Sequence, residues 1–125
     1  MKTVQVTEGS MRLFVPEESL TPPHKAAVFY NPNMAENRAL SSLALGALLP
    51  DLNGSVLLDG FCACGARGIR YALDNFLSKI VFLDANPDAM ALARKNAKTN
   101  GILDAVFFEG FFEDYPDKAD VVEVD

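Results

Sequence analysis

Two acidic residues and a cluster of glycines have the types and spacing needed to bind a small molecule. Asp59 ends a short apolar run, glycines follow it at positions 60, 65 and 68, and Asp84 ends a second apolar run. Glycine is needed where the backbone adopts unusual dihedral angles or approaches a ligand closely. An acid at a strand end can accept hydrogen bonds from both hydroxyls of a ribose. Together these features predict a site for a cofactor that carries a nucleoside.

The composition of the glycine turn distinguishes two such cofactors. A dinucleotide-binding turn reads Gly-x-Gly-x-x-Gly and places a pyrophosphate at a helix N-terminus. Residues 59–68 read Asp-Gly-Phe-Cys-Ala-Cys-Gly-Ala-Arg-Gly, and the leading acid would repel a pyrophosphate. The same carboxylate could pair with the ammonium group of a methionine moiety. The turn therefore favours S-adenosylmethionine over NAD, and a non-catalytic module that binds a nucleotide is the alternative.

The hydrophobic pattern around the turn predicts an α/β fold with an open parallel sheet. Four apolar runs have the length of buried strands: residues 55–59, 79–84, 105–108 and 119–124. A turn at Asn53-Gly54 would lead into the first of them. Ligands of such sheets bind at the carboxyl ends of the strands. We therefore expect Asp59 and Asp84 to lie at the same edge of the sheet.

Three segments are predicted to be helices. Residues 66–77 follow the glycine turn, and a well-delimited helix follows Asn86, with Pro87 at its first position and Gly101 just past its end. A third begins at residue 33 or 34, runs to residue 49 and is closed by Pro50. Its apolar positions follow helical spacing and predict an amphipathic helix: Leu40, Leu43, Ala44, Ala47 and Leu48.

The N-terminal region has a different pattern. Alternating residues over 2–7, a possible turn at 8–10 and an apolar run over 12–15 predict a small β-hairpin appended to the fold. Prolines at 16, 22 and 23 predict an irregular connection over 16–25. We expect the hairpin and connection to occupy residues 1–27 and a Rossmann-like domain to occupy residues 28–125.

Composition narrows the possible surroundings and partners. The 17 acidic residues exceed the 11 basic ones, so the overall field would repel a polyanion, and an RNA would need local basic groups or further sequence. Cys62 and Cys64 are too close for an ordinary disulfide and lack the further ligands of a zinc site. No apolar run approaches the roughly 20 residues needed to span a membrane. These observations predict a cytoplasmic protein without a bound metal.

Two longer stretches carry a specific resemblance. Residues 28–38, Val-Phe-Tyr-Asn-Pro-Asn-Met-Ala-Glu-Asn-Arg, precede the turn whose core is Gly65-x-Arg67-Gly68-Ile69-Arg70. This combination resembles the archaeal and eukaryotic tRNA guanine-26 N2-dimethyltransferases, and the likeness runs from about Val4 to the last residue. It implies a Rossmann-like methyltransferase fold, S-adenosylmethionine as the cofactor, tRNA as the substrate and, in a eukaryote, a nuclear location.

The resemblance also implies roles for individual residues. Arg38 and Arg67 would help to hold the cofactor, Asp84 would bind its ribose, and Asp125 matches the family's catalytic aspartate. With the turn residues, the expected cofactor-binding set is Arg38, Asp59, Gly60, Gly65, Arg67, Asp84 and Ala85. The sequence departs from the family pattern at Ala39, Ala66 and Gly110-Phe111-Phe112, the last in the region beside the adenine.

The family's fourth strand continues into Asp-Pro-Phe-Gly, whereas this sequence stops at Asp125. We therefore expect a fold that is incomplete at its C-terminus: the N-terminal, cofactor-binding portion of a methyltransferase, inactive alone. The alternative is one half of a split enzyme whose second chain supplies the remainder and the tRNA-binding domain. The exposed edge of the fourth strand predicts self-association.

Each assignment has a simpler structural alternative. The alternative for Asp59 is that it caps the following turn, and the alternative for Asp84 is that it caps the following helix, as aspartates often do. Arg38 and Arg67 are alternatively solvated helix residues. The two cysteines are expected to be packing residues, and the aromatic cluster is expected to be core rather than a base-stacking platform: Phe107, Phe108, Phe111, Phe112 and Tyr115.

Overall fold

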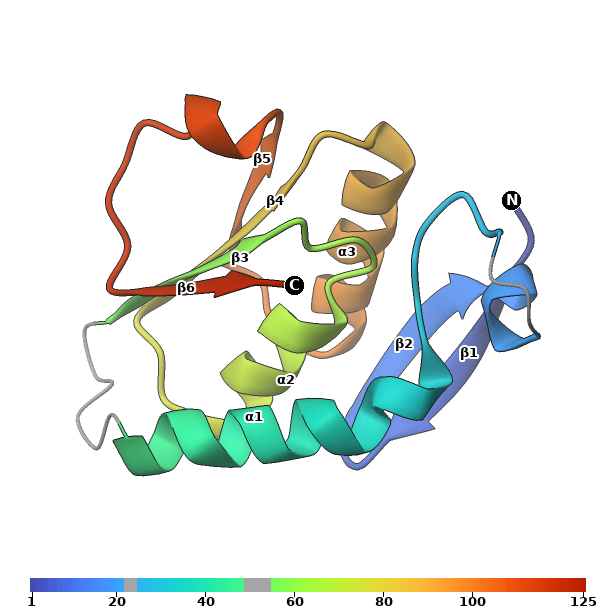
Figure 1. Cartoon of the computed structure of the whole chain (residues 1–125), viewed down its shortest axis with the longest axis horizontal. Coiled ribbons are helices and arrows are strands. Elements are labelled where there is room, and N and C mark those ends of the chain that lie inside the picture. The colour runs from blue at the N-terminus through green and yellow to red at the C-terminus, as the bar shows by residue number, and fades with distance from the viewer. Residues whose placement is uncertain (22–24, 49–54) are drawn as a thin grey trace.

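The computed structural model describes residues 1–21, 25–48 and 55–125, and within them it forms a parallel sheet with helices and an N-terminal hairpin (Figure 1). Residues 22–24 and 49–54 lie outside the description. Three predictions fall on them: the prolines at 22 and 23, the helix end at 49–50, and the turn at Asn53-Gly54.

The sheet contains the four predicted strands, all parallel, in the order β5-β4-β3-β6. Their bounds lie within two residues of the prediction: β3 Val56–Gly60, β4 Lys79–Asp84, β5 Val106–Glu109 and β6 Val121–Val124. The central strands are buried on both faces, which is why β3 and β4 are continuous apolar runs. The α/β class and the parallel sheet are confirmed, and β3 and β4 are neighbours, as the site requires.

Two helices connect these strands. α3 (Pro87–Thr99) has the predicted ends, because the Asn86 side chain accepts a 3.0 Å bond from the Asp88 N–H and Gly101 has a φ of 77°. α2 (Ala66–Asp74) ends three residues earlier than predicted. Asn75 is extended there, and its side-chain amide donates to the Tyr71 carbonyl at 3.2 Å, which ends the helix.

The face of the sheet opposite α2 and α3 is covered by the segment between β5 and β6, which includes the 3-10 helix η3 (Phe112–Asp114). Buried Leu58, Val81 and Leu83 pack against Phe112 and Tyr115 of this segment and against Phe108 of β5. Phe107 stacks on Phe82 with ring centroids 5.3 Å apart. These aromatics therefore serve as core, as expected, whereas Phe111 is 62% exposed.

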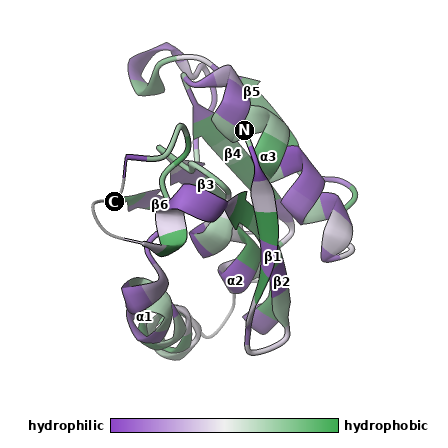
Figure 2. Ribbon diagram, turned by 90° about the vertical axis from the view of Figure 1, so that its right-hand side faces the viewer, coloured by the Kyte–Doolittle hydropathy of each residue, from purple (hydrophilic) through white to green (hydrophobic). Residues whose placement is uncertain are grey.

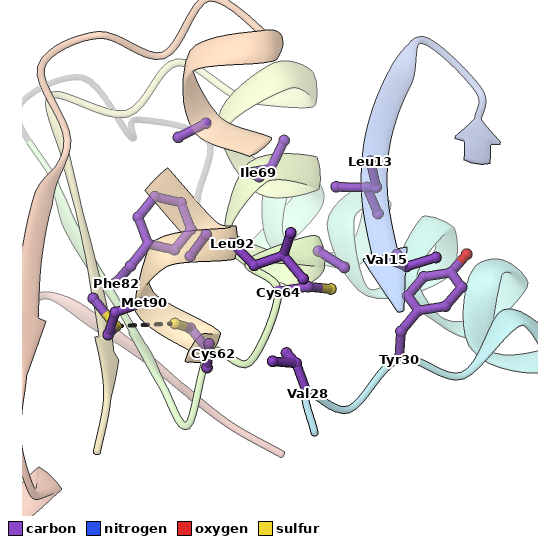
Figure 3. Packing of buried hydrophobic residues seen from close by; sticks show 14 of the residues in the cluster. Leu13, Val15, Val28, Tyr30, Cys62, Cys64, Ile69, Phe82, Met90 and Leu92 are labelled. Carbon is purple, nitrogen blue, oxygen red and sulfur yellow. Dashed lines mark hydrogen bonds between the residues drawn. The ribbon is translucent and has the colours of Figure 1, made fainter. Parts of the chain in front are cut away.

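The N-terminal hairpin shares the main core. β1 (Thr3–Glu8) and β2 (Met11–Pro16) pair antiparallel. Three alternate residues of β2 are fully buried: Met11, Leu13 and Val15. Figure 3 shows Leu13 and Val15 in one cluster with Cys64 of the glycine turn and Ile69 of α2. The hairpin is therefore not an appendage, although the division of the chain at residue 27 stays a prediction.

Two asparagines, Asn96 of α3 and Asn100 at its C-cap, attach the hairpin through hydrogen bonds to the β2 backbone. The Asn96 amide accepts from the Phe14 N–H at 2.6 Å and donates to the Phe14 carbonyl at 2.9 Å. One helical turn later, Asn100 makes the same pair of bonds with Arg12, at 2.9 Å and 2.6 Å. The two asparagines are one helical turn apart and their β2 partners are two residues apart, so the helix and the strand run alongside each other with these polar groups satisfied.

The connection after the hairpin is more regular than predicted. β2 continues through Pro16, and a 3-10 helix, η1 (Glu17–Leu20), follows it. The prediction of an irregular segment from residue 16 is therefore wrong for its first residues. A strand can end at proline because the ring removes only the N–H donor.

The predicted third helix is α1 (Ala35–Leu48), which continues from the 3-10 helix η2 (Pro32–Met34). Its apolar stripe is exposed: Leu40 by 61%, Leu43 by 71% and Leu48 by 78%. Arg38 and Ser42 are the buried residues instead, because α1 packs on α2 and not on the sheet. Figure 2 shows α1 at one end of the molecule, with hydrophobic and hydrophilic residues along it. Within the described residues, nothing covers the stripe.

Candidate functional site

The turn between β3 and α2 has an unusual backbone. Phe61, Ala63 and Gly65 have positive φ angles of 55°, 50° and 84°. Only glycine adopts such angles without strain, so Phe61 and Ala63 store strain of order 1–3 kcal/mol each. The Cys62 N–H donates to the Leu83 carbonyl of β4 at 2.9 Å, which holds the turn against the neighbouring strand. Strained backbone of this kind is typical of ligand-binding turns.

A substitution at Gly65 tests the backbone conformation of this turn. Replacing Gly65 with alanine should lower the free energy of unfolding by about 1–2 kcal/mol, because alanine is strained at this φ and its Cβ would lie 3.3 Å from Ile69 Cδ1. Ala63→Gly is the matched control in the same turn, and we expect it to change the stability little, since relief of strain offsets the added flexibility. Urea denaturation measures both, and a neutral Gly65→Ala variant would contradict the assigned backbone.

Asp84, at the end of β4, fixes the turn from the other side. Its Oδ2 accepts from the Ala63 N–H at 2.9 Å, and its Oδ1 accepts from the Asn86 N–H at 2.9 Å. The N-cap of α3 is Asn86, so Asp84 fixes the turn and the residue before the helix and does not cap the helix itself. A carboxylate has about four lone-pair positions, so these two bonds leave acceptor capacity for hydroxyl groups.

Asp59, at the end of β3, is a buried acid. Its side chain accepts from the Gly68 N–H of α2 at 3.0 Å, so it caps the first turn of that helix. Burial raises the pKa of Asp59 to about 7; the bond from Gly68 lowers it in part, and the negative charge of Glu123 raises it further. An acid in this position is stabilised in its ionised form by an added cation.

Gly68 explains why α2 can approach the sheet so closely. A Cβ at this position would lie 2.6 Å from Phe82 Cε1 and 2.8 Å from Asp59 Oδ2. No side chain fits into that space without displacing the strand residues. The second and third glycines of the turn thus have separate purposes, one for dihedral freedom and one for close packing.

A cavity of about 350 Å³ lies over the turn. Four of the expected site residues line it: Arg38, Asp59, Arg67 and Asp125. A neighbouring pocket is lined by Phe61, Ala63 and Asp125, which also line the cavity, and by Asp84 and Asn86. Three of the expected site residues line neither pocket: Gly60 is buried beneath the Phe112 ring, Gly65 is buried beside Ile69, and Ala85 is exposed.

Arg67 joins three elements at the side of this cavity. Its Nε donates to Asp125 Oδ2 at 2.8 Å, and its Nη2 donates to Asn37 Oδ1 at 2.7 Å. Burial lowers the pKa of Arg67, but the bond to Asp125 and the charge of Glu123 outweigh it, so the pKa is raised and Arg67 stays charged. Its side chain is only 12% exposed, so the solvated alternative is wrong. Asp125, the expected catalytic residue, and Arg67, an expected cofactor-binding residue, thus form an ion pair.

Arg38 is also buried, so the alternative that it is a solvated helix residue is wrong too. It pairs with Glu8 of the hairpin, and its Nη2 donates to the Asn31 carbonyl at 3.0 Å. The sequence prediction missed Glu8 and Tyr30 as members of the site. Glu8 was assigned to a turn, and only its place in the Glu-Gly pair of the family resemblance could have drawn attention to it.

The two cysteines are packing residues. Both are buried thiols, and burial raises the pKa of Cys64 to about 12. Cys62 Sγ contacts the Met90 sulfur at 4.0 Å (Figure 3). Among the described residues, no group of three or more His, Cys, Asp or Glu could hold a metal ion. In the same part of the chain, no helix combines the length and apolar character that crossing a bilayer requires.

Several solved structures share this fold. Trm5b from Pyrococcus abyssi superposes with a TM-score of 0.76 over 96% of this chain and 32% of its own, at 22% identity, which supports the fold alone. Trm1 from Pyrococcus horikoshii, solved with S-adenosyl-L-methionine, is 33% identical with a TM-score of 0.62, over 78% of this chain and 24% of its own. The Rossmann-like methyltransferase fold is therefore confirmed.

Sequence comparisons give the family. The tRNA (guanine(26)-N(2))-dimethyltransferase of Saccharolobus solfataricus is 38% identical across all of this chain, which spans 34% of that protein. The enzyme of the same name from Saccharolobus islandicus is 41% identical over 86% of the chain, which spans 29% of it. A model of the family described as N2,N2-dimethylguanosine tRNA methyltransferase matches residues 9–123. Since that match covers nearly every residue and agrees with the resemblance found in the sequence, the chain belongs to the N2,N2-dimethylguanosine tRNA methyltransferase family.

Proposed function

We propose that this chain is the S-adenosylmethionine-binding portion of a tRNA guanine-N2 dimethyltransferase that acts on guanine 26. The observation that carries the proposal is that a buried acid, Asp59, and a buried guanidinium, Arg38, both line one cavity. An amino-acid group has an ammonium and a carboxylate, and these two side chains offer each of them a partner of opposite charge. A pyrophosphate would find Asp59 repulsive.

In this proposal each site residue has a distinct task. Asp59 receives the ammonium of the methionine part, Arg38 and Arg67 provide positive charge for its carboxylate, and Asp84 accepts bonds from the ribose. Gly60, Gly65 and Ala85 are proposed to contribute through the backbone of the two strand ends and the turn, which positions the other site residues. The cofactor, when bound, supplies an electrophilic methyl group on a positively charged sulfur.

Asp125 is proposed to act on the target amine. The amine of guanine is a poor nucleophile because its lone pair is delocalised into the ring, so it must be held in line and its developing charge stabilised. A carboxylate at the end of β6 can accept a hydrogen bond from the amine and stabilise that charge. Arg67 Nε donates to Asp125 Oδ2 at 2.8 Å, which holds the carboxylate beside the cavity.

Calorimetry with two ligands tests this proposal. We expect the chain to bind S-adenosylhomocysteine and to give no heat of binding with NAD. The alternative, a module that binds a dinucleotide, predicts the reverse. Binding of NAD alone would therefore overturn the proposal, and the same titration with Asp59→Asn tests whether the signal comes from the described cavity.

The proposal limits what the chain does alone. It spans between 29% and 34% of the length of the two Saccharolobus relatives. With a net charge of −6, it has no general attraction for tRNA, so we propose that further sequence or a second chain binds the RNA. We accordingly expect cofactor binding without methyl transfer.

The location and the division of the chain remain proposals. We propose a cytoplasmic location or, in a eukaryote, a nuclear one. The proposed division places the hairpin and connection at residues 1–27 and the partial domain at residues 28–125.

Self-association through the sheet edge is a further expected result. β6 ends the sheet, and its residues Val122 and Val124 are 48% and 58% exposed. An unprotected edge strand invites pairing with a second chain, and a lysine on it opposes this pairing. We therefore expect sedimentation velocity to show dimers or larger species for the chain and a shift toward monomer for Val122→Lys. A monomeric wild-type chain at all concentrations would contradict the prediction.

A further inference from the structure

A buried cluster joins the N-terminal hairpin to the cavity. Glu8, the last residue of β1, accepts from Arg38 Nε at 3.0 Å and from Arg38 Nη2 at 2.5 Å. The Tyr30 hydroxyl donates to the same carboxylate at 2.6 Å. The side chains of Glu8 and Arg38 are each only 6% exposed. Three segments that are distant in the sequence therefore meet in one charged cluster inside the protein.

The bonds of this cluster fix the direction of the Arg38 guanidinium. Arg38 donates to the Glu8 carboxylate from two adjacent nitrogens, Nε and Nη2, and Nη2 also donates to the Asn31 carbonyl at 3.0 Å. The guanidinium carbon lies 5.0 Å from the Tyr30 ring centroid. These contacts use Nε and Nη2 and leave out Nη1. Because Arg38 also lines the cavity, Nη1 is the nitrogen available for a ligand there.

Stability alone does not account for such a cluster. A buried ion pair seldom stabilises a fold more than apolar residues of similar volume would, because both charges lose their hydration. Burial raises the pKa of Glu8, yet the bonds from Arg38 and Tyr30 outweigh it and leave the pKa below its ordinary value. The carboxylate is therefore ionised at neutral pH, and it offsets the charge of Arg38 while leaving one edge of the guanidinium unused.

We propose that Glu8 is a positioning residue: it orients Arg38 so that the guanidinium receives the carboxylate of the cofactor's methionine part. The proposal rests on the proposed function, since it needs the cavity to bind S-adenosylmethionine. Glu8 itself contacts only Arg38 and Tyr30 in this cluster, so it acts through Arg38. The hairpin then has a purpose beyond packing, because it brings the orienting acid to the site.

A pair of ligands separates positioning from a merely structural role. S-adenosylhomocysteine has the carboxylate, whereas S-adenosyl-3-thiopropylamine is the same molecule without it. We expect Glu8→Ala to weaken binding of the first by about tenfold or more, since a charge-assisted bond is lost. Binding of the second should stay within about twofold. Calorimetry on folded variants, checked by circular dichroism, gives both constants.

The controls make each outcome decisive. Arg38→Ala should show the same ligand-selective loss, and adding Glu8→Ala to it should cause no further loss, because the two residues act as one unit. Glu36→Ala removes an exposed acid from the same first turn of α1 and should change neither constant. If Glu8→Ala does not fold, the nearly isosteric Glu8→Gln replaces it, with a smaller loss for S-adenosylhomocysteine alone.

Two results would overturn the proposal. Equal weakening of both ligands would mean that Glu8 only supports the fold, and unchanged binding of both would mean that Arg38 does not need it. If the wild-type chain binds neither ligand, the proposed function itself fails. That outcome is distinct, because it appears before any variant is made.

Discussion

Replacing Leu13 with alanine should lower the free energy of unfolding by about 2–5 kcal/mol, the usual cost of removing a large side chain from a packed core. Leu13 is fully buried, and it belongs to the same cluster as residues of α2, α3 and the sheet. The cavity left behind would separate the hairpin from Ile69. Urea denaturation followed by circular dichroism measures the change.

Leu43→Ala is the matched control for this experiment. It removes the same atoms from α1, where the side chain is 71% exposed, and it should change the stability by no more than about 0.5 kcal/mol. A large difference between the two variants supports a hairpin that is integral to the core. Small, equal effects would mean that the hairpin is the appendage that the sequence suggested.

Lowering the pH below about 7 should weaken the binding of S-adenosylhomocysteine by about tenfold for each pH unit. Burial, against the opposing Gly68 bond, raises the pKa of Asp59 to about 7 from its ordinary 3.8. Only the ionised acid attracts the ligand's ammonium, so affinity is retained above that pH and lost progressively below it. Titration calorimetry from about pH 5.5 to about pH 8.5, a range that spans this pKa, measures how the affinity for S-adenosylhomocysteine depends on pH.

Asp59→Asn isolates the group responsible. The amide can still accept the Gly68 N–H but has no charge, so we expect weak binding that does not vary over this range. The stability of the unliganded protein should change with pH in the opposite direction to the affinity. Because the folded pKa of Asp59 is raised, its ionisation lowers the free energy of unfolding as the pH rises from about 4 to 7. Asp59→Asn should therefore be more stable than the wild-type chain at pH 8. A wild-type affinity independent of pH would contradict this account of Asp59.

Much of the fold could be predicted because its signals are local. The run of apolar residues before Asp84 identifies β4 without knowledge of its neighbours. Asn86, Pro87 and Gly101 mark the ends of α3 through capping and dihedral preferences that depend on adjacent residues only. Acids at two successive strand ends then placed Asp59 and Asp84 at one edge of the sheet, as the structure has them.

The remaining features depend on contacts between distant segments. The apolar stripe of α1 has helical spacing, but spacing does not reveal whether a partner surface is present, and Leu43 proves to be exposed. Glu8 and Arg38 are 30 residues apart, and Arg67 and Asp125 are 58 apart. No local pattern links such pairs, since each forms only when the hairpin, α1, α2 and β6 have reached their final positions.

A crystal structure of the chain with S-adenosylhomocysteine tests the central claim most directly. The account predicts the amino-acid part of the ligand in the cavity, with its ammonium at Asp59 and its carboxylate at Arg38, and the ribose hydroxyls at Asp84. A ligand bound elsewhere, or one whose amino-acid part lies away from both Asp59 and Arg38, would contradict the account.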